Sequence, residues 1–382
     1  MTSGFAFTYG PSLRCGAGST AQIAELLPPG PVLFVTDKQL LAHGLADVAL
    51  ASLEESGRSV SIFDSVEPDP SDATVLKAVA QGRDVGASAV VGFGGGSPMD
   101  VAKVAAYLLA NDEPLEAIYG VGKATGPAAP LILCPTTAGT GSEATPIAII
   151  TTEDGRKLGI VSPSLYAQWA LLDPTLTISL PPPITAATGI DAIVHAIEAY
   201  TSARLKNPIS DMLARQALQL LAGNLHKVIA DGQDLAAREA MLLGSHLAGV
   251  AFSNAPVAAV HALAYPLGGI FHVPHGLSNA LMLCHVLRFN MPAAERAYAE
   301  LAPLIDPKLA ALEQGARAQA FVSALSQLIT DIGLPDKLSA MGIGAEHLDL
   351  LAEEAMLQTR LLINNPRSME RDQVRALYEA AL

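Results

Sequence analysis

The clearest fold signal in the first half of the chain is residues 89–98, Ala89-Val90-Val91-Gly92-Phe93-Gly94-Gly95-Gly96-Ser97-Pro98. A short apolar run is typical of a buried strand, and the three glycines after it favour a tight turn. Ser97 is suited to an N-cap and Pro98 to the first helical position, so a helix is expected to begin here. The stretch therefore predicts a strand, a glycine turn and a helix in succession, which is the unit from which open α/β sheets are built.

The same turn is a candidate phosphate site. Glycines let a ligand approach the backbone of Gly95 and Gly96 closely, and the first N–H groups of a helix that begins at Ser97 attract a pyrophosphate. The residues do not form the G-x-G-x-x-G fingerprint, so the usual Rossmann-fold argument does not transfer unchanged. A glycine-rich turn without a ligand is the alternative.

Strand and helix signals alternate through the first 180 residues or so. Val32–Val35 and Leu131–Cys134 are two further short apolar runs. Helices are expected between the strands, over Gln39–Ser56, Ser71–Gly82 and Pro98–Leu109. This alternation predicts a mostly parallel sheet with helices on both faces. Ile147–Thr152 and Lys157–Val161 flank Asp154-Gly155, which predicts a β-hairpin.

The pattern changes at Leu180-Pro181-Pro182-Pro183. Strand signals nearly vanish beyond these prolines, and helices are expected over Thr185–Tyr200, Pro208–Ala222, Leu235–Ala251, Ala255–Gly268 and Gly315–Ile332. A chain of 382 residues is also too long for one ordinary core. We therefore expect an α/β dinucleotide-binding domain over residues 1–180 and an all-helical metal-binding domain over residues 181–382.

Composition and charge exclude several classes of protein. Hydrophobic residues make up 50% of the chain and charged residues 16%, which describes a globular protein with a large core. The formal charge of −14, without any cluster of lysine or arginine, argues against nucleic acid and anionic membranes as partners. Cys15, Cys134 and Cys284 show neither a disulfide framework nor C-x-x-C spacing. With no secretory signal in Met1–Gly10 and no apolar stretch long enough for a bilayer, we expect a cytoplasmic protein.

Polar residues that follow the expected strands are candidates for contact with a dinucleotide. Asp37 follows the Val32–Val35 strand, at the end where ligands bind in open α/β sheets. Its carboxylate can accept from both hydroxyls of an adenosine ribose and would repel a 2′-phosphate, whereas capping the next helix is the alternative. Thr136 and Thr137 follow the third strand in the segment 136–143, whose small hydroxyl and glycine residues suit either a cofactor contact or a simple turn.

Asp191, His195, His261 and His275 are the candidate metal ligands. Asp191 and His195 are four residues apart, so a helix would place both side chains on one face. His261 falls in a second helical stretch, and His275 follows the turn at Val273-Pro274. One carboxylate and three imidazoles suit a divalent first-row ion such as Fe²⁺ or Zn²⁺, in a site of the open, catalytic kind. Spacing does not establish that these segments converge, and a structural role is the alternative for any single histidine.

Several motifs together resemble the iron-containing (group III) alcohol dehydrogenases, which are related to glycerol dehydrogenase and dehydroquinate synthase. The matching stretches run in the family's order over essentially the whole chain: GGGSPMDVAK at 94–103, TTAGTGSE at 136–143, LP at 180–181, TGIDA at 188–192, HAIEAY at 195–200 and PHG at 274–276. The resemblance implies a dehydroquinate synthase-like fold, with an N-terminal dinucleotide-binding domain, a helical C-terminal domain and an active site in the cleft between them. A homodimer is the family's default assembly.

The resemblance also implies roles for individual residues. The metal, iron or alternatively zinc, would be ligated by Asp191, His195, His261 and His275. The NAD cofactor would be contacted by Asp37, Gly95, Gly96, Ser97, Thr136, Thr137 and Lys157.

The chain departs from the family pattern at two positions. Many relatives carry a further histidine, assigned to proton relay, four residues after the third ligand, and this chain has Tyr265 there. The offset of four from His261 places Tyr265 on the ligand's helix face, but a reference pKa of about 10 makes tyrosine a poor base at neutral pH. His272, three residues before His275, is a candidate substitute, for which a surface role is the alternative. Asp69 stands where many relatives have asparagine.

These observations favour a metal-dependent oxidoreductase that transfers a hydride between NAD(H) and a small alcohol, aldehyde or ketone, with Tyr265 as a candidate catalytic group. A maleylacetate reductase-like enzyme would work without metal, and because such relatives generally lack the acidic ligand, Asp191 speaks against it. A 2-hydroxyacid dehydrogenase or hydroxyacid-oxoacid transhydrogenase-like activity would connect Tyr265 with a carboxylate-bearing substrate. A non-catalytic metal- or nucleotide-binding protein is disfavoured by the joint presence of the four ligands and the glycine turn.

Overall fold

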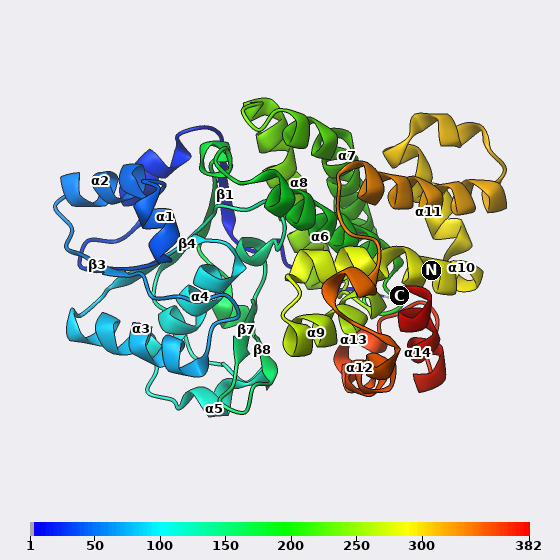
Figure 1. Cartoon of the computed structure of the whole chain (residues 1–382). Coiled ribbons are helices and arrows are strands. Elements are labelled where there is room, and N and C mark those ends of the chain that lie inside the picture. Colours follow the sequence, from blue (N-terminus) through cyan, green and yellow to red (C-terminus); the bar gives the residue numbers. More distant parts are fainter. Residues whose placement is uncertain (1–3) are drawn as a thin grey trace. The chain divides into compact units, whose positions relative to one another are not determined.

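The computed structural model describes residues 4–382 and contains two compact units (Figure 1). One unit comprises Tyr9–Ser179. The other comprises Leu180–Leu382 and the N-terminal residues up to Thr8, whose backbone N–H and carbonyl both bond the side chain of Asn254 at 2.8 Å. The functional division at residue 180 stays a prediction. The first three residues, which belong to the segment expected to lack a secretory signal, lie outside the described part.

The α/β unit is built on a six-stranded sheet in which every neighbouring pair is parallel. Its order is β1 (Ser12–Cys15), β9 (Trp169–Leu172), β6 (Leu131–Pro135), β4 (Ala89–Gly94), β2 (Val32–Val35) and β3 (Val60–Phe63). The predicted parallel sheet and its three predicted strands are confirmed. The strands β1, β3 and β9 were not predicted from the sequence. Polar residues such as Arg14 and Ser61 interrupt the apolar pattern of β1 and β3.

Both faces of this sheet are buried, as a parallel sheet requires. Val32 and Phe34 lie in one buried cluster with residues of the helix Asp47–Glu55. Leu33 and Val35 lie in a second cluster with residues of the helices Asp72–Asp84 and Gly96–Ala110. The helices of this unit, drawn in blue and cyan in Figure 1, are α1 (Lys38–Ala42), α2 (Asp47–Glu55), α3 (Asp72–Asp84), α4 (Gly96–Ala110) and α5 (Leu115–Ile118).

Two expectations about these helices are wrong. The single helix expected over Gln39–Ser56 is broken into α1 and α2, because Gly44 adopts a φ of 69°, which ends the first helix. The N-cap of α4 is Gly95 rather than Ser97, so Ser97 and Pro98 lie in the first helical turn. Gly94 has a φ of 150°, a conformation that L side chains rarely adopt, and this lets the chain turn from strand to helix two residues earlier than expected.

A smaller sheet completes the α/β unit. It contains β5 (Gly120–Val121), β8 (Lys157–Val161) and β7 (Ile147–Thr151), and β7 pairs with β8 in antiparallel fashion. The connecting turn passes through Gly155, whose φ is 79°. The predicted β-hairpin is therefore confirmed.

The second unit is helical, as expected. Its helices are α6 (Pro182–Thr201), α7 (Pro208–Ala230), α8 (Leu235–Asn254), α9 (Ala259–Phe271), α10 (His275–Ile305), α11 (Gln314–Asp331), α12 (Leu348–Met356), α13 (Thr359–Leu362) and α14 (Arg371–Ala380). Helix α6 is buried over most of its length and packs against α7, α8 and α10. Helix α10, the longest helix described in this unit, was not predicted from the sequence.

Within residues 4–382, no single helix combines the length and the apolar character needed to cross a membrane. Helices α8 and α9 meet those criteria only when they are taken together, across a bend of 107°.

Candidate functional site

The four candidate metal ligands come together in the helical unit. Asp191 and His195 lie on α6, His261 lies on α9, and His275 is the first residue of α10. One donor atom from each residue lies within 4.8 Å of the donor atoms of the other three. The Oδ1 atom of Asp191 lies 3.9, 3.8 and 3.5 Å from the Nε2 atoms of His195, His261 and His275, respectively.

Helix α10 reaches this cluster because its first turn lies directly against α6. Helix α9 ends at Phe271 and is followed by its C-cap His272, an exposed residue in the left-handed conformation with a φ of 55°. Helix α10 begins three residues after His272. A Cβ atom at Gly276 would lie 2.3 Å from the carbonyl oxygen of Ala187, so only glycine fits beside the α6 backbone here. Ala187 is one turn before Asp191, and the close approach therefore places His275 next to that carboxylate.

Burial and charge at the cluster favour bound cations. Asp191, His195 and His261 are buried, whereas the side chain of His275 is 41% exposed. Burial would raise the pKa of the Asp191 carboxyl, but His195, His275, His261 and the amide of Asn279 outweigh this effect and lower the pKa below its usual value. Asp191 therefore presents a carboxylate to the three imidazoles.

Glu198 fixes the orientation of one imidazole. Its Oε2 atom lies 2.7 Å from Nδ1 of His261, and its two oxygens accept hydrogen bonds from the backbone N–H groups of Ala258 and Val260. Since a carboxylate can only accept, Nδ1 of His261 carries a proton and Nε2 offers a lone pair to the cluster. The Nε2 atoms of His261 and His195 are 3.0 Å apart. A carboxylate and imidazole lone pairs this close are the donor set of a transition-metal site, completed by the type of outer carboxylate that tunes metal-bound histidines.

Glu198 and Asn279 also belong to the site, although neither was predicted from the sequence. Asn279 is fully buried, its Nδ2 donates to Oδ1 of Asp191 at 2.6 Å, and its own Oδ1 has no hydrogen-bond partner among residues 4–382. Their helical spacing from a candidate ligand is the sequence signal that could have identified both residues. Glu198 follows His195 by three positions, and Asn279 follows His275 by four, so each shares a helix face with a ligand.

Tyr265 lies beside the cluster. It is half-buried on α9, and its ring centroid is 6.0 Å from that of His275. The offset of four from His261 thus brings the side chain close to a candidate ligand, as the sequence analysis expects. His272 is exposed and serves as the left-handed residue that ends α9, which matches the surface alternative.

The candidate cofactor residues gather at one edge of the parallel sheet in the α/β unit. The chain places β3 on one side of β2 and then returns to place β4 on the other side, so the strand order reverses between β2 and β4. Ligands of open α/β sheets bind at such a switch point, beyond the carboxyl ends of the strands. Six of the predicted contacts follow β2, β4 or β6, which are neighbours in the sheet: Asp37, Gly95, Gly96, Ser97, Thr136 and Thr137.

The start of α4 is shaped as a site for an anion. Within the described residues, no side chain caps this helix end, whose N-cap is Gly95. A Cβ atom at Gly96 would lie 3.2 Å from Cγ2 of Thr140, and one at Gly95 would lie 3.7 Å from the side chain of Thr137. The segment that follows β6 therefore lies against the first turn of α4, whose N–H groups are suited to phosphate oxygens.

Asp37 and Lys157 each have a structural partner. Asp37 is the N-cap of α1, where its Oδ1 accepts from the N–H groups of Gln39 and Leu40. This contact matches the alternative role for Asp37, which is to cap the next helix. The capping carboxylate lies just beyond the end of β2. Lys157, on β8, forms an ion pair with Asp69 in which Nζ and Oδ1 are 2.6 Å apart. Asp69 itself adopts a φ of 53° between its two flanking prolines.

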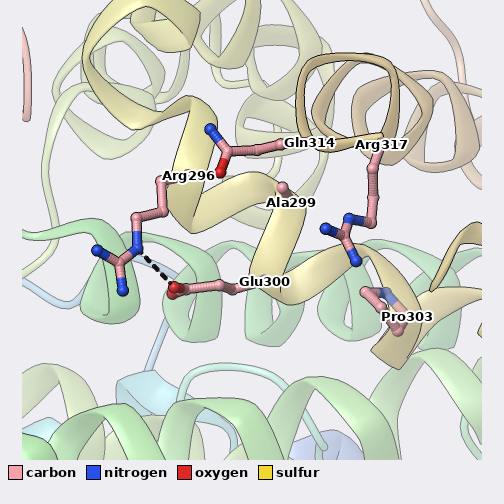
Figure 2. Close-up of a pocket in the computed structure, with 6 residues that line it drawn as sticks. All are labelled: Arg296, Ala299, Glu300, Pro303, Gln314 and Arg317. Carbon is pink, nitrogen blue, oxygen red and sulfur yellow. Dashed lines mark hydrogen bonds and ion pairs between the residues drawn. The ribbon is translucent and has the colours of Figure 1, made fainter. Parts of the chain in front are cut away.

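A pocket of about 230 Å³ lies on the helical unit, between α10 and the start of α11 (Figure 2). It is lined by Arg296, Ala299, Glu300, Pro303, Gln314 and Arg317. Three of its polar side chains are already paired, because Nε of Arg296 donates to Glu300 at 2.9 Å and Gln314 donates to Glu295 at 2.8 Å. At about 1.5 Å of rise per residue, Arg296 is roughly 30 Å along α10 from His275. The pocket is therefore separate from the cluster of candidate metal ligands.

Comparison with known proteins agrees with this geometry. Residues 11–174 match the model of the iron-containing alcohol dehydrogenases, and residues 185–382 match that of the C-terminal part of the Fe-containing alcohol dehydrogenase family. The chain is 40% identical over 353 residues to a long-chain-alcohol dehydrogenase 1 of Geobacillus thermodenitrificans, covering 92% of this chain and 89% of the relative. It is 34% identical over 349 residues to an NAD-dependent methanol dehydrogenase of Bacillus methanolicus, covering 90% and 91%.

A solved structure shares the whole fold. The crystal structure of a 1,3-propanediol oxidoreductase superimposes with a TM-score of 0.96 at 36% identity, and the match covers 100% of both chains. Sequence motifs, the parallel sheet, the helical unit and the Asp/His cluster thus lead to the same assignment. The chain is an oxidoreductase that belongs to the iron-containing alcohol dehydrogenase family.

Proposed function

We propose that this enzyme interconverts a small alcohol and its aldehyde or ketone, with NAD(H) as the hydride carrier and one divalent metal ion per chain. The observation that carries the proposal is the convergence of four donor atoms within 4.8 Å of one another, with Glu198 directing the lone pair of His261 inward. Asp191, His195, His261 and His275 would hold Fe²⁺, or alternatively Zn²⁺. Such an ion supplies Lewis acidity toward a substrate oxygen.

Residues of this chain would orient the substrate and carry the proton that its oxygen gains or loses. The exposed side of the cluster is that of His275, whose imidazole is the most accessible of the four groups. The phenol of Tyr265, beside His275, can donate a hydrogen bond to a substrate oxygen or to a water that relays the proton. Asp191 keeps its negative charge because the surrounding imidazoles lower its pKa.

On the cofactor side, we propose that NAD binds at the carboxyl ends of β2, β4 and β6. The N-terminus of α4 would take the pyrophosphate through the backbone of Gly95, Gly96 and Ser97. Thr136 and Thr137 would hydrogen-bond the cofactor, and Lys157 would contact it from β8. The printed name of the Bacillus methanolicus relative, an NAD-dependent enzyme, supports this choice of cofactor.

The preference for NAD over NADP is expected to depend on Asp37. Replacing Asp37 by Gly should narrow the preference, mainly by improving the use of NADP, because a carboxylate near the ribose repels a 2′-phosphate. Asp37→Asn is the matched variant, since it removes the charge but can still cap α1. The measurement is kcat/KM for both cofactors in the three proteins. A wild-type enzyme that uses NADP as well as NAD would show that Asp37 does not contact the ribose.

Tyr265 is expected to act through one hydrogen bond rather than as a base. Tyr265→Phe keeps the ring beside His275 but removes the hydroxyl, so the loss should be about 0.5–1.5 kcal/mol, or about two- to tenfold in rate. Tyr265→His should shift the pH profile of kcat/KM toward an imidazole-like ionisation. If Tyr265 only fills space, the Phe variant will be silent and the His variant will only lose stability. A loss of several thousandfold in the Phe variant would assign essential proton chemistry to the phenol.

The alternative enzymes are less well supported. A maleylacetate reductase-like enzyme does not need an acidic metal ligand, yet Asp191 is buried at the centre of the imidazole cluster and hydrogen-bonded to Asn279. A transhydrogenase-like enzyme would be recognised by hydride exchange between a hydroxyacid and an oxoacid without added cofactor. We further propose a cytoplasmic homodimer, in keeping with the family's default assembly and with three cysteines that form no disulfide.

The decisive experiment combines metal analysis with activity. Purified protein should contain close to one equivalent of iron or zinc per chain, and a panel of alcohols, aldehydes and hydroxyacids should be tested by NADH absorbance. We expect turnover with small alcohols or aldehydes that is lost on chelation and restored by the metal. Full activity in protein that is free of metal would contradict the proposal, and turnover with hydroxyacids alone would favour the alternative.

A further inference from the structure

A fully buried lysine and its acceptors form a polar network inside the α/β unit. Lys103, on α4, is 0% exposed, and its Nζ lies 2.6 Å from both Oγ of Ser142 and the carbonyl oxygen of Ile147. Oδ1 of Asp100 is 3.3 Å away and Oγ1 of Thr145 is 3.4 Å away. Burial lowers the pKa of the Lys103 ammonium, and the charge of Asp100 opposes that change. A buried ammonium is tolerated only when it has such partners.

The network connects segments that are far apart in the sequence. Ser142 donates from Oγ to Oδ1 of Asp100 at 2.6 Å, and Oδ2 of Asp100 accepts from the N–H of Ile149 at 2.9 Å. Asp100 and Lys103 lie in the first turns of α4, Ser142 lies near the end of the segment 136–143 that follows β6, and Ile149 belongs to β7. Breaking one contact therefore loosens the attachment of that segment to α4.

The two connected elements are those that form the candidate phosphate site. Thr137 and Thr140 lie against the positions where Gly95 and Gly96 lack side chains, so the segment 136–143 forms one wall beside the first turn of α4. Its first end is held by β4, because the N–H of Thr136 donates to the carbonyl oxygen of Gly94, the last residue of that strand, at 2.9 Å. Its second end is held by the buried network.

We propose that Asp100, Lys103 and Ser142 are positioning residues that set the shape of the NAD phosphate site. They hold the segment 136–143 against the N-terminus of α4 and act through Thr137 and Gly96, without touching the cofactor themselves. The inference rests on the proposed binding of NAD at this edge of the sheet. It predicts that loosening the network weakens cofactor binding, whereas the metal cluster in the helical unit keeps its metal.

The test compares two buried serines of the same unit. Ser142→Ala removes the hydroxyl that bonds both Lys103 and Asp100, whereas Ser162→Ala removes a buried hydroxyl that donates to the Ala124 carbonyl outside the network. We expect Ser142→Ala to bind NADH about two- to tenfold more weakly by equilibrium fluorescence, the effect of one hydrogen bond. Hydrogen exchange should be faster in residues 136–143 and in the first turn of α4. The Ser162→Ala protein should show neither change, and both should retain metal.

The outcomes separate this inference from the proposed function. If wild-type protein binds NADH and both serine variants bind it equally well, the positioning role is overturned while the NAD site stands. If wild-type protein does not bind NADH, the proposed function fails and the inference fails with it. Thr145→Val, a nearly isosteric change at another member of the network, serves if Ser142→Ala does not fold. A change in the same direction supports the proposal, and an unchanged affinity for NADH overturns it.

Discussion

Replacing His261 by Ala is expected to remove the metal and the activity together. His261 contributes a buried Nε2 donor, and Glu198 holds its other ring nitrogen at 2.7 Å. Losing an outer carboxylate alone costs about 10- to 100-fold in metal affinity, so losing the ligand itself should cost more than about 100-fold. Metal per chain should fall well below one, and turnover should fall by the same fraction. Metal analysis and NADH absorbance on the same preparation measure both quantities.

The control for this variant is His246→Ala. His246 is as buried as His261 but lies on α8 and is not one of the four candidate ligands. Both variants lose a buried imidazole, so both should lose some stability, and thermal melting without metal should show comparable losses. Only His261→Ala should lose metal. Full turnover in metal-free His261→Ala protein would exclude the proposed chemistry. If His246→Ala loses as much metal as His261→Ala, the metal loss comes from general destabilisation and not from the loss of a ligand.

The parallel sheet could be predicted because its central strands carry their own signal. Val32–Val35 and Leu131–Cys134 are apolar throughout, since residues on both faces of a parallel sheet are buried. The strand–glycine–helix stretch at 89–98 adds a turn that few other sequences permit. Helix boundaries were harder to predict, because they depend on individual backbone conformations such as those of Gly44 and Gly94.

The candidate site was predicted only in part. The residues that were not predicted, Glu198 and Asn279, escaped notice for the same reason. Asp191 and His195 could be grouped from their spacing, but the convergence of α6, α9 and α10 is a tertiary property that no local pattern encodes. Glu198 and Asn279 serve the cluster through hydrogen bonds to the ligands. Their residue types are common on helix faces, so their roles emerge only when their partners are in place. The same holds for Lys103, whose burial contradicts the usual exposure of lysine.

A single methyl group at Gly276 is expected to displace His275 from the other candidate metal ligands. Its Cβ would lie 2.3 Å from the carbonyl oxygen of Ala187 and 2.7 Å from the carbonyl carbon. These are backbone atoms of α6 and cannot rotate away, so the first turn of α10 must move. His275 and Asn279 move with α10, whereas Asp191 stays on α6. Gly276→Ala should therefore cost about 1–3 kcal/mol of stability through overpacking. A shift of about 1 Å at the ligands should cost on the order of 100-fold in turnover.

Gly269→Ala is the matched control, because a Cβ atom at Gly269 meets no atom within 4 Å and the residue lies on the exposed side of α9. Alanine is favoured over glycine inside helices by up to about 1 kcal/mol, so this variant should be as stable as the wild type or slightly more stable. The comparison needs thermal melting with and without metal, the metal content after dialysis, and kcat. If Gly276→Ala keeps the metal and the turnover of Gly269→Ala, α10 can adjust without moving His275. The close packing of α10 on α6 would then not be what places His275 beside Asp191. If Gly276→Ala loses metal while it melts close to the wild-type temperature, the loss follows from the displaced ligand alone, because the fold has survived.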